Sequence, residues 1–393
     1  KVDMVDVAVI GVGQTCYGMH PYKTLKDLFH EAAVDAFDDV DKGFDPLEVE
    51  EAYIGSLSTG GGQLGNFAPL MMEAAGMIGA SSRHIENACA SSGFAMRDAV
   101  AAIASGRTKI AVAGGIEKMS DLPRERNRLW LGISGDVEWE RLAGTNFAGI
   151  YAMMARRHMY EFGTDEKQIK IAAVKNRANA MANPKAQFRV PIDLERAMKS
   201  PNLASPLSLS DACGITDGAS VVIMCRANLA SSFTNQPVLV VGSGGASDYV
   251  AIHDRYTMTA LEGTRRAAKQ AYEMAGIGPK NIDFAEVHDC FSIAELLACE
   301  DLGFCEKGDA GKYIESGATG RNGARPVNNS GGLIAKGHPI GSTGTGQIYE
   351  VVKQLRGRAD TPERQLNNKR YGLTQNVGGS GAAVAVHILK AVD

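Results

Sequence analysis

Short apolar runs that end near glycine alternate along this chain with longer segments that carry apolar residues on one face. Runs of this length are typical of buried strands, and apolar residues spaced i, i+3, i+4, i+7 are typical of helices. The segment from Ile348 to Leu355 has the helical spacing, which stops at Gly357. The predicted strands are residues 7–13, 52–56, 109–115, 219–225, 237–244, 284–288, 371–377 and 382–388.

The two halves of the chain repeat one order of elements. Each half opens with a Val-rich strand ending in Gly-x-Gly, carries a long helix after a turn of small residues, and closes with two strands around a glycine loop. TDGASVVIMC (216–225) and GSGAAVAVHIL (379–389) hold equivalent final positions. The repeat predicts an α/β fold of two duplicated halves, with two sheets and shared central helices.

Residues 118–200 interrupt the first half and contain no strand-like run. They hold 15 Lys and Arg and 10 Asp and Glu, which gives this segment a net charge of +5. Because the whole chain carries −4, the remaining residues carry −9. This excess indicates either a site for a polyanionic ligand or ordinary solvated helix faces. We predict an N-terminal half at 1–117 plus 201–232, an insert at 118–200 and a C-terminal half at 233–393.

Composition narrows the class of protein. The chain has a formal charge of −4, from 41 basic and 45 acidic residues. We therefore expect no general electrostatic attraction of the chain to nucleic acid or to an anionic membrane. Seven cysteines without Cys-x-x-Cys spacing indicate free thiols in a reducing compartment and no zinc site. No apolar run reaches the roughly 18 residues of a membrane span, and the first residues lack a signal-peptide pattern. We expect a soluble cytoplasmic protein that holds no metal.

Cys89 is the first candidate for chemistry. It lies in ENACASSGF (86–94), directly before a helix of small and apolar residues that ends at Gly106. The free N–H groups of a helix N-terminus stabilise a thiolate, so we expect the pKa of Cys89 to be lowered. The alternative is a buried structural cysteine, the commonest state of a free thiol.

Two glycine-rich segments add further candidates. His338 lies in NNSGGLIAKGHPIGSTGTG (328–346), where glycines let the backbone close on a ligand, and such a histidine suits acid/base work. NVGGSG (376–381) can be interpreted as a hairpin turn or as a set of backbone amides that bind an oxyanion, and one segment could serve both purposes.

A further motif, EVHDCFSI (286–293), places His288 and Cys290 between a predicted strand and a predicted helix.

NACASSG, HDCF, the GHPIGSTG segment and the final GGSG turn, in this order on a duplicated α/β core, resemble the thiolase superfamily. The likeness covers nearly the whole chain and is weakest in the insert. HDCF, with Asn376 where many thiolases carry the cysteine of a Cys-x-Gly motif, resembles sterol-carrier-protein-type and archaeal acetoacetyl-CoA thiolases. The resemblance implies the thiolase fold, a five-layered α-β-α-β-α core with a mainly helical loop domain that binds coenzyme A.

The resemblance also implies roles for particular residues. Cys89 would take an acyl group, and His338 would deprotonate Cys89 and help to hold a thioester oxygen. The amide of Gly378, with that of Cys89, would form the oxyanion hole of the acyl-enzyme. His288 would hold the second thioester oxygen as an enolate develops.

The likeness to HDCF thiolases assigns the α-carbon base to Cys290. A Claisen condensation needs such a base apart from the nucleophile, and the amide of Asn376 cannot accept the proton. The alternative is that Cys290 packs into the start of the helix and that His288 is the base.

The implied reaction condenses two acetyl-CoA molecules into acetoacetyl-CoA and CoA, or runs the reverse thiolysis, and would feed mevalonate and isoprenoid synthesis. Coenzyme A thioesters are substrate and product, and no tightly bound cofactor is expected. Cys213 lies in a stretch that contacts pantetheine in many thiolases, and Arg156 and Arg157 are candidates for the phosphates of coenzyme A. A homodimer or dimer of dimers is implied, as is a complex with hydroxymethylglutaryl-CoA synthase through a small zinc-containing acyl-CoA-binding protein.

Other classes of protein compete with this interpretation. VAVIGVGQTCYG resembles a dinucleotide-binding turn, but Cys16 stands where the third glycine belongs and Gly18 comes two residues late. A decarboxylating ketosynthase would not need a second thiol, and a non-catalytic acyl-CoA-binding scaffold would not need all four reactive residues. A 3-ketoacyl-CoA thiolase of broader chain length stays open.

Overall fold

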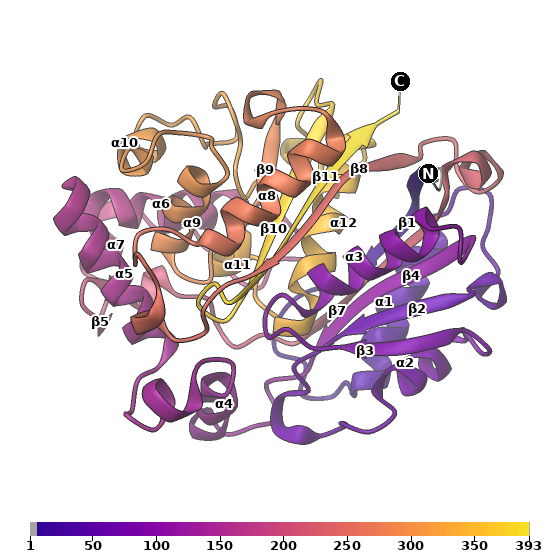
Figure 1. The fold of residues 1–393 in the computed structure, drawn as a ribbon, viewed down its shortest axis with the longest axis horizontal. Helices are drawn as coiled ribbons and strands as arrows, with labels where there is room; N and C mark the ends of the chain where they lie inside the picture. The colour runs from indigo at the N-terminus through magenta and orange to yellow at the C-terminus, as the bar shows by residue number, and fades with distance from the viewer. Residues whose placement is uncertain (1–5, 393) are drawn as a thin grey trace.

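The computed structural model describes residues 6–392, whose nine longer strands form one sheet in the order β3-β2-β4-β7-β1-β8-β11-β10-β9 (Figure 1). β1 pairs with β7 on one side and with β8 on the other, so the two predicted sheets are joined edge to edge. The N-terminal half contributes β1 (Val7–Gln14), β2 (Glu51–Gly55), β3 (Ser81–Ile85), β4 (Ile110–Glu117) and β7 (Gly218–Arg226). The C-terminal half contributes β8 (Val238–Ser247), β9 (Phe284–Glu286), β10 (Tyr371–Gly378) and β11 (Ala383–Ala391).

Strand directions confirm the duplication. β1 is antiparallel to β7, β7 is antiparallel to β4, and β4 is parallel to β2. The same pattern runs through β8, β11, β10 and β9. At the position equivalent to β3, the C-terminal half has a single parallel bridge between Ala285 and Val327 in the described part of the chain. All eight predicted strands are present, and β3 is an additional strand.

The helices complete five layers. α3 (Ser91–Ala104) and α12 (Thr343–Leu355) contact strands of both halves and form the central layer. α1 (Leu25–Asp38) and α2 (Phe67–Ala75) cover the outer face of the N-terminal strands, and α8 (Glu262–Ala275), beside α9 (Ser292–Asp301), covers the C-terminal strands. The central helices touch closely, because a Cβ on Gly344 would lie 2.3 Å from the backbone nitrogen of Gly93.

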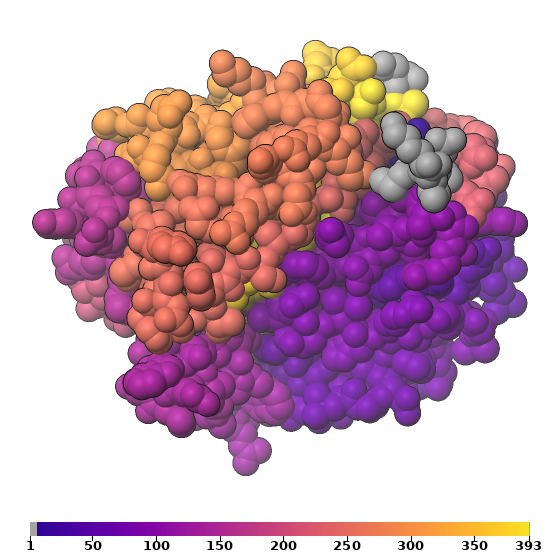
Figure 2. Space-filling view, viewed as in Figure 1, coloured from indigo at the N-terminus to yellow at the C-terminus, as the bar shows by residue number. Residues whose placement is uncertain are grey.

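The insert is helical, as predicted. It contains α4 (Arg124–Gly132), α5 (Phe147–Phe162), α6 (Glu166–Ala180) and α7 (Leu194–Met198), and a small two-stranded sheet of β5 (Asn202–Ala204) and β6 (Leu207–Ser208) follows it. α5 and α6 contact α9, and their apolar residues share one cluster with the C-terminal half. Figure 2 shows most of the insert, in magenta, beside the orange C-terminal half.

Two short helices, α10 (Ala310–Glu315) and α11 (Gly332–Ala335), complete the C-terminal half. Within residues 6–392, no helix is long and apolar enough to cross a membrane. The exact limits of the three predicted domains stay a prediction.

Candidate active site

Three of the sequence motifs meet at one buried point. Cys89 precedes α3, His288 follows β9, and His338 follows α11. The Cys89 sulfur and one ring nitrogen from each histidine lie within 4.8 Å of one another. The two imidazole rings stand edge to face, with 5.0 Å between their centroids. Such a set of atoms could hold a metal such as Zn²⁺, but it is equally suited to moving a proton from a thiol.

The hydrogen bonds of His338 fix its tautomer. The Thr343 hydroxyl donates to the carbonyl of Pro339 at 3.0 Å and therefore accepts from Nδ1 of His338 at 2.6 Å. Nδ1 then carries the hydrogen, which leaves Nε2 as a proton acceptor. Burial lowers the pKa of His338 to about 3, so the ring is neutral near pH 7. His338 is thus set up as a base.

His288 has the opposite arrangement. Its Nδ1 accepts from the backbone N–H of Val377 and faces the Asn376 amide nitrogen, both at 3.4 Å. The hydrogen therefore sits on Nε2, which is buried without a hydrogen-bond partner among the described residues. Burial holds the pKa of His288 well below its usual value, and a proton on His338 would lower it further. A neutral N–H aimed into the site is a donor for a developing oxyanion.

The expected lowering of the pKa of Cys89 is wrong. Cys89 packs in a small apolar cluster with Leu57, Met119 and Ile340, and this burial raises its pKa to about 12. The backbone N–H of Gly379 acts in the opposite direction by hydrogen bonding to the sulfur. The resting pair is therefore a neutral thiol beside a neutral imidazole.

This pairing predicts a pH profile for alkylation of Cys89 by iodoacetamide. Because only the thiolate reacts and the pKa lies near 12, the rate is expected to rise about tenfold per pH unit from pH 7 to 9 without a plateau. Peptide mapping by mass spectrometry after timed quenching measures this rate. A plateau below pH 8 would instead indicate a thiolate–imidazolium pair in the resting enzyme.

Asn376 fixes the turn that carries Cys89. Its amide nitrogen donates to the carbonyl of Cys89 at 2.9 Å, and its amide oxygen accepts from the N–H of Gly93 at 3.2 Å. A Cβ on Gly93 would lie 2.7 Å from that oxygen, so the glycine makes room for the amide. Asn376 therefore links the start of α3 to β10.

The HDCF turn brings its other side chains to the same place. Asp289 accepts the backbone N–H of Leu333 at 2.6 Å and so ties this turn to the segment that leads to His338. Cys290 is buried, and its thiol hydrogen bonds with the hydroxyl of Tyr151 from α5. Burial raises the pKa of Cys290 well above its usual value, and ionisation of Cys213 or Cys89 would raise it further.

Gly378 ends β10 where the GGSG segment turns into β11, so that segment is a hairpin turn. A Cβ on Gly378 would lie 2.3 Å from the carbonyl oxygen of Asn87, which leaves room only for glycine. The amide that faces the Cys89 sulfur is that of the next residue, Gly379. An oxyanion role for Gly378 stays a prediction.

A cleft of about 730 Å³ is lined by residues of the insert and by Phe291, the neighbour of Cys290. Cys213 lines it, and the Cys213 N–H donates to the carbonyl of Cys290 at 3.1 Å. Leu131 and Ile215 line the cleft and also pack against the apolar cluster around Cys89. Cys213 therefore lies in the cleft and is hydrogen bonded to the turn that carries Cys290.

Arg156 and Arg157 are not part of this cleft. They line a separate hollow with Tyr160 and Ser205, where Arg156 donates to the Ser205 hydroxyl at 2.7 Å and Arg157 pairs with Glu161. Their placement on α5 turns them away from the cleft, whereas Arg124, Arg128 and Arg177 line it.

Sequence reasoning missed several residues that shape the site. The hydroxyl of Tyr151, the amide of Gly379 and the oxygen of Thr343 all contact reactive side chains. Glu117, buried at the end of β4, accepts the N–H groups of Leu57, Thr59 and Gly341 and so ties together two loops beside Cys89. The only signal for Glu117 was a carboxylate directly after a predicted strand.

Comparison with known proteins covers the whole chain. The family described as Thiolase, N-terminal domain, matches residues 2–228, and Thiolase C-terminal domain-like matches residues 244–391. An acetyl-CoA acetyltransferase of Methanothermobacter thermautotrophicus is 44% identical over 98% of this chain and 99% of the relative, and one of Methanocaldococcus jannaschii is 40% identical over the same shares. The crystal structure of human mitochondrial 3-ketoacyl-CoA thiolase in complex with CoA superposes with a TM-score of 0.78 at 19% identity, over 99% of this chain and 98% of that one.

Proposed function

The chain belongs to the thiolase family, and from that premise we propose that it is an acetyl-CoA C-acetyltransferase. It condenses two acetyl-CoA molecules into acetoacetyl-CoA and CoA, or catalyses the reverse thiolysis, through an acyl group on Cys89. The observation that carries the proposal is the pair of buried neutral histidines around Cys89, one a proton acceptor and the other an N–H donor. Both halves of a Claisen condensation need these two functions.

In the first half, Nε2 of His338 takes the thiol proton of Cys89, and the thiolate attacks the carbonyl carbon of acetyl-CoA. The amides of Cys89 and Gly378 receive the developing oxyanion. The bond between the acetyl carbon and the CoA sulfur breaks, and CoA leaves with the proton from His338. The acetyl group then remains on Cys89.

In the second half, the Cys290 thiol first loses its proton to solvent, and the thiolate then takes a proton from the α-carbon of a second acetyl-CoA. The enolate oxygen accepts the N–H of His288, and the enolate carbon attacks the acetyl group on Cys89. Acetoacetyl-CoA forms, and Cys89 leaves as a thiolate that regains a proton from solvent. Both thiols therefore end the cycle protonated, as they began it.

Incubation with acetyl-CoA tests the proposal. Mass spectrometry of the quenched protein is expected to show one acetyl group on the peptide that contains Cys89, and acetoacetyl-CoA is expected in solution. Turnover of malonyl-CoA without acetyl-CoA turnover would identify a ketosynthase, and binding without acylation would identify a scaffold. Thiolysis of longer 3-ketoacyl-CoA substrates measures whether chain length is broader.

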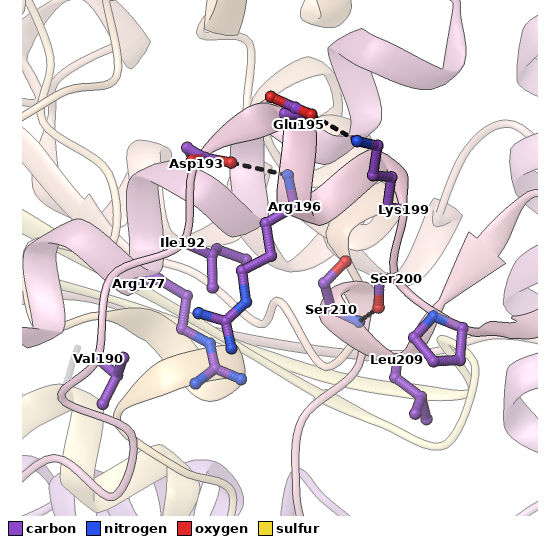
Figure 3. A pocket seen from close by; sticks show the side chains of 11 residues that line it. Arg177, Val190, Ile192, Asp193, Glu195, Arg196, Lys199, Ser200, Leu209 and Ser210 are labelled. Carbon is purple, nitrogen blue, oxygen red and sulfur yellow. Dashed lines mark hydrogen bonds and ion pairs between the residues drawn. The ribbon is translucent and has the colours of Figure 1, made fainter.

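We propose a binding site for the phosphates of coenzyme A. A hollow of about 630 Å³ next to the cleft shares Arg177 and Leu209 with it. Arg177 on α6 and Arg196 on α7 point into this hollow (Figure 3), and no ion pair to a carboxylate is seen for either within residues 6–392. Burial, and then the Arg196 charge, lower the pKa of Arg177, so the two guanidinium groups repel until an anion lies between them. This is the geometry for a phosphate.

Arg177→Gln and Arg196→Gln are expected to raise the KM for acetyl-CoA roughly tenfold each, with a smaller dependence of KM on salt. The kcat is expected to change little, because neither side chain reaches the reactive residues. Steady-state kinetics at two ionic strengths measure both effects. Arg156→Gln and Arg157→Gln are the matched comparison. A larger increase in KM from these two variants would mean that the phosphates bind at Arg156 and Arg157, as first expected from the sequence.

Assembly and pathway form a further part of the proposal. β3 pairs on one side only among residues 6–392, and its free edge supports pairing with a second copy in a homodimer or dimer of dimers. All seven cysteines are free, which supports a reducing compartment such as the cytoplasm. A complex with hydroxymethylglutaryl-CoA synthase through a zinc-containing protein, and a place in mevalonate synthesis, rest on the archaeal resemblance. Elution of the native protein as a free dimer without synthase activity would count against that complex.

A further inference from the structure

Tyr151 enters the active site from the insert. It lies on α5 and is fully buried, and its ring is 4.9 Å from the ring of Phe291, the neighbour of Cys290. Its hydroxyl donates to the carbonyl of Gly379 at 3.2 Å and also hydrogen bonds with the thiol of Cys290. One hydroxyl therefore contacts both the HDCF turn and the glycine turn beside Cys89.

Cys290 needs such a partner if it is to act as a thiolate. The groups that interact with it from the packed elements are Cys213, Cys89, Asp289 and Tyr151. Burial and the first three favour the neutral thiol, and the hydrogen bond from Tyr151 is the contact that favours the thiolate. The pKa of Tyr151 is itself raised well above its usual value by burial, so the hydroxyl keeps its hydrogen.

We propose that Tyr151 is a positioning residue for the second half of the reaction, holding the Cys290 sulfur and donating a hydrogen bond to it when the thiolate forms. In the resting site the thiol donates to the Tyr151 oxygen while the hydroxyl donates to Gly379. When the thiol loses its proton, the hydroxyl hydrogen turns to the sulfur. The inference rests on the proposed function, because proton abstraction by Cys290 is a step of that function. It gives the insert a part in this step as well as in binding.

Tyr151→Phe removes the hydroxyl and keeps the ring against Phe291. Acetylation of Cys89 by acetyl-CoA is expected to proceed at the wild-type rate, while condensation at pH 7 falls about 10- to 100-fold, the range for a hydrogen bond to a charged group. Loss of a group that favours the thiolate raises the pKa of Cys290. The rise of the condensation rate with pH is therefore expected to move to higher pH, with partial recovery in alkaline buffer.

Tyr272→Phe on α8 is the matched control, since that half-buried hydroxyl donates to the carbonyl of Leu302 at 2.9 Å in the outer layer. It is expected to leave both half-reactions and the pH profile unchanged. Condensation by Tyr151→Phe at the wild-type rate with an unshifted profile would overturn the inference, as would an equal loss of acetylation and condensation, which a merely structural role gives. Failure of the wild-type protein to acetylate Cys89 would overturn the proposed function instead, so the two failures are distinguishable.

Discussion

Cys89→Ala is expected to lower the rates of both condensation and thiolysis by on the order of 10⁴–10⁶-fold, the largest effect of any single change in this protein. In the proposed mechanism no other side chain takes the acyl group, because the nitrogens of His338 and His288 serve proton transfer and oxyanion binding and Cys290 serves as the base. Catalytic residues that act as a unit lose most of their effect when the nucleophile is removed. Acetoacetyl-CoA formation and the mass of the protein after exposure to acetyl-CoA measure the loss.

The chain offers a matched control for this variant. Cys225 lies in β7, is as buried as Cys89, and has a pKa that burial raises to about 12 as well. Cys225→Ala removes an equivalent buried thiol far from the histidines and is expected to keep full activity apart from a modest loss of stability. Cys89→Ala is also expected to bind CoA with the wild-type Kd. Condensation by Cys89→Ala within tenfold of the wild-type rate would mean that another residue carries the acyl group.

The sequence predicted the fold well, because its strands and helices depend on local patterns. Buried strands of a duplicated α/β core are short apolar runs, and these were recognisable. β3 was missed because Ser81–Ile85 is mostly polar and lies at the edge of the sheet, with partial exposure. Cys89, His288 and His338 could be assigned together only through the resemblance to a family.

Electrostatics were less predictable than geometry. The helix N-terminus beside Cys89 is visible in the sequence, and it suggested a lowered pKa. Leu57, Met119 and Ile340, which bury the thiol, come from three distant segments, and their effect is the larger. The direction of a pKa shift in a buried site therefore depends on contacts that no local pattern contains.

The insert was interpreted from its charge and from the family resemblance, and neither shows which side chains meet. Arg156 and Arg157 are adjacent in sequence, but the face of α5 that carries them lies over a separate hollow. Arg177 and Arg196 are further apart and converge because α6 and α7 meet at one side of the hollow. Tyr151 was missed because nothing in the sequence distinguishes a buried aromatic residue beside a thiol from one in an ordinary core.

Cys290→Ala is expected to separate the two halves of the reaction. Acetylation of Cys89 needs only His338 and the oxyanion amides, so it is expected to survive. Condensation and thiolysis are expected to fall about 10²–10⁴-fold, the effect attributed to a general base. Cys299→Ala is the matched control, because that thiol is also fully buried by the C-terminal half and lies on α9, away from the histidines.

The competing base is His288, and its hydrogen bonds argue against it. Nδ1 already accepts from Val377, and Nε2 carries the hydrogen, so neither nitrogen has a free lone pair for the α-proton. Cys290 has no such obstacle, since loss of its proton leaves a sulfur that Tyr151 can stabilise. His288→Ala is therefore expected to weaken condensation through loss of the enolate donor while Cys290 still exchanges the α-proton. Solvent deuterium appearing in acetyl-CoA with His288→Ala, and not with Cys290→Ala, would confirm this assignment, and the reverse pattern would make His288 the base.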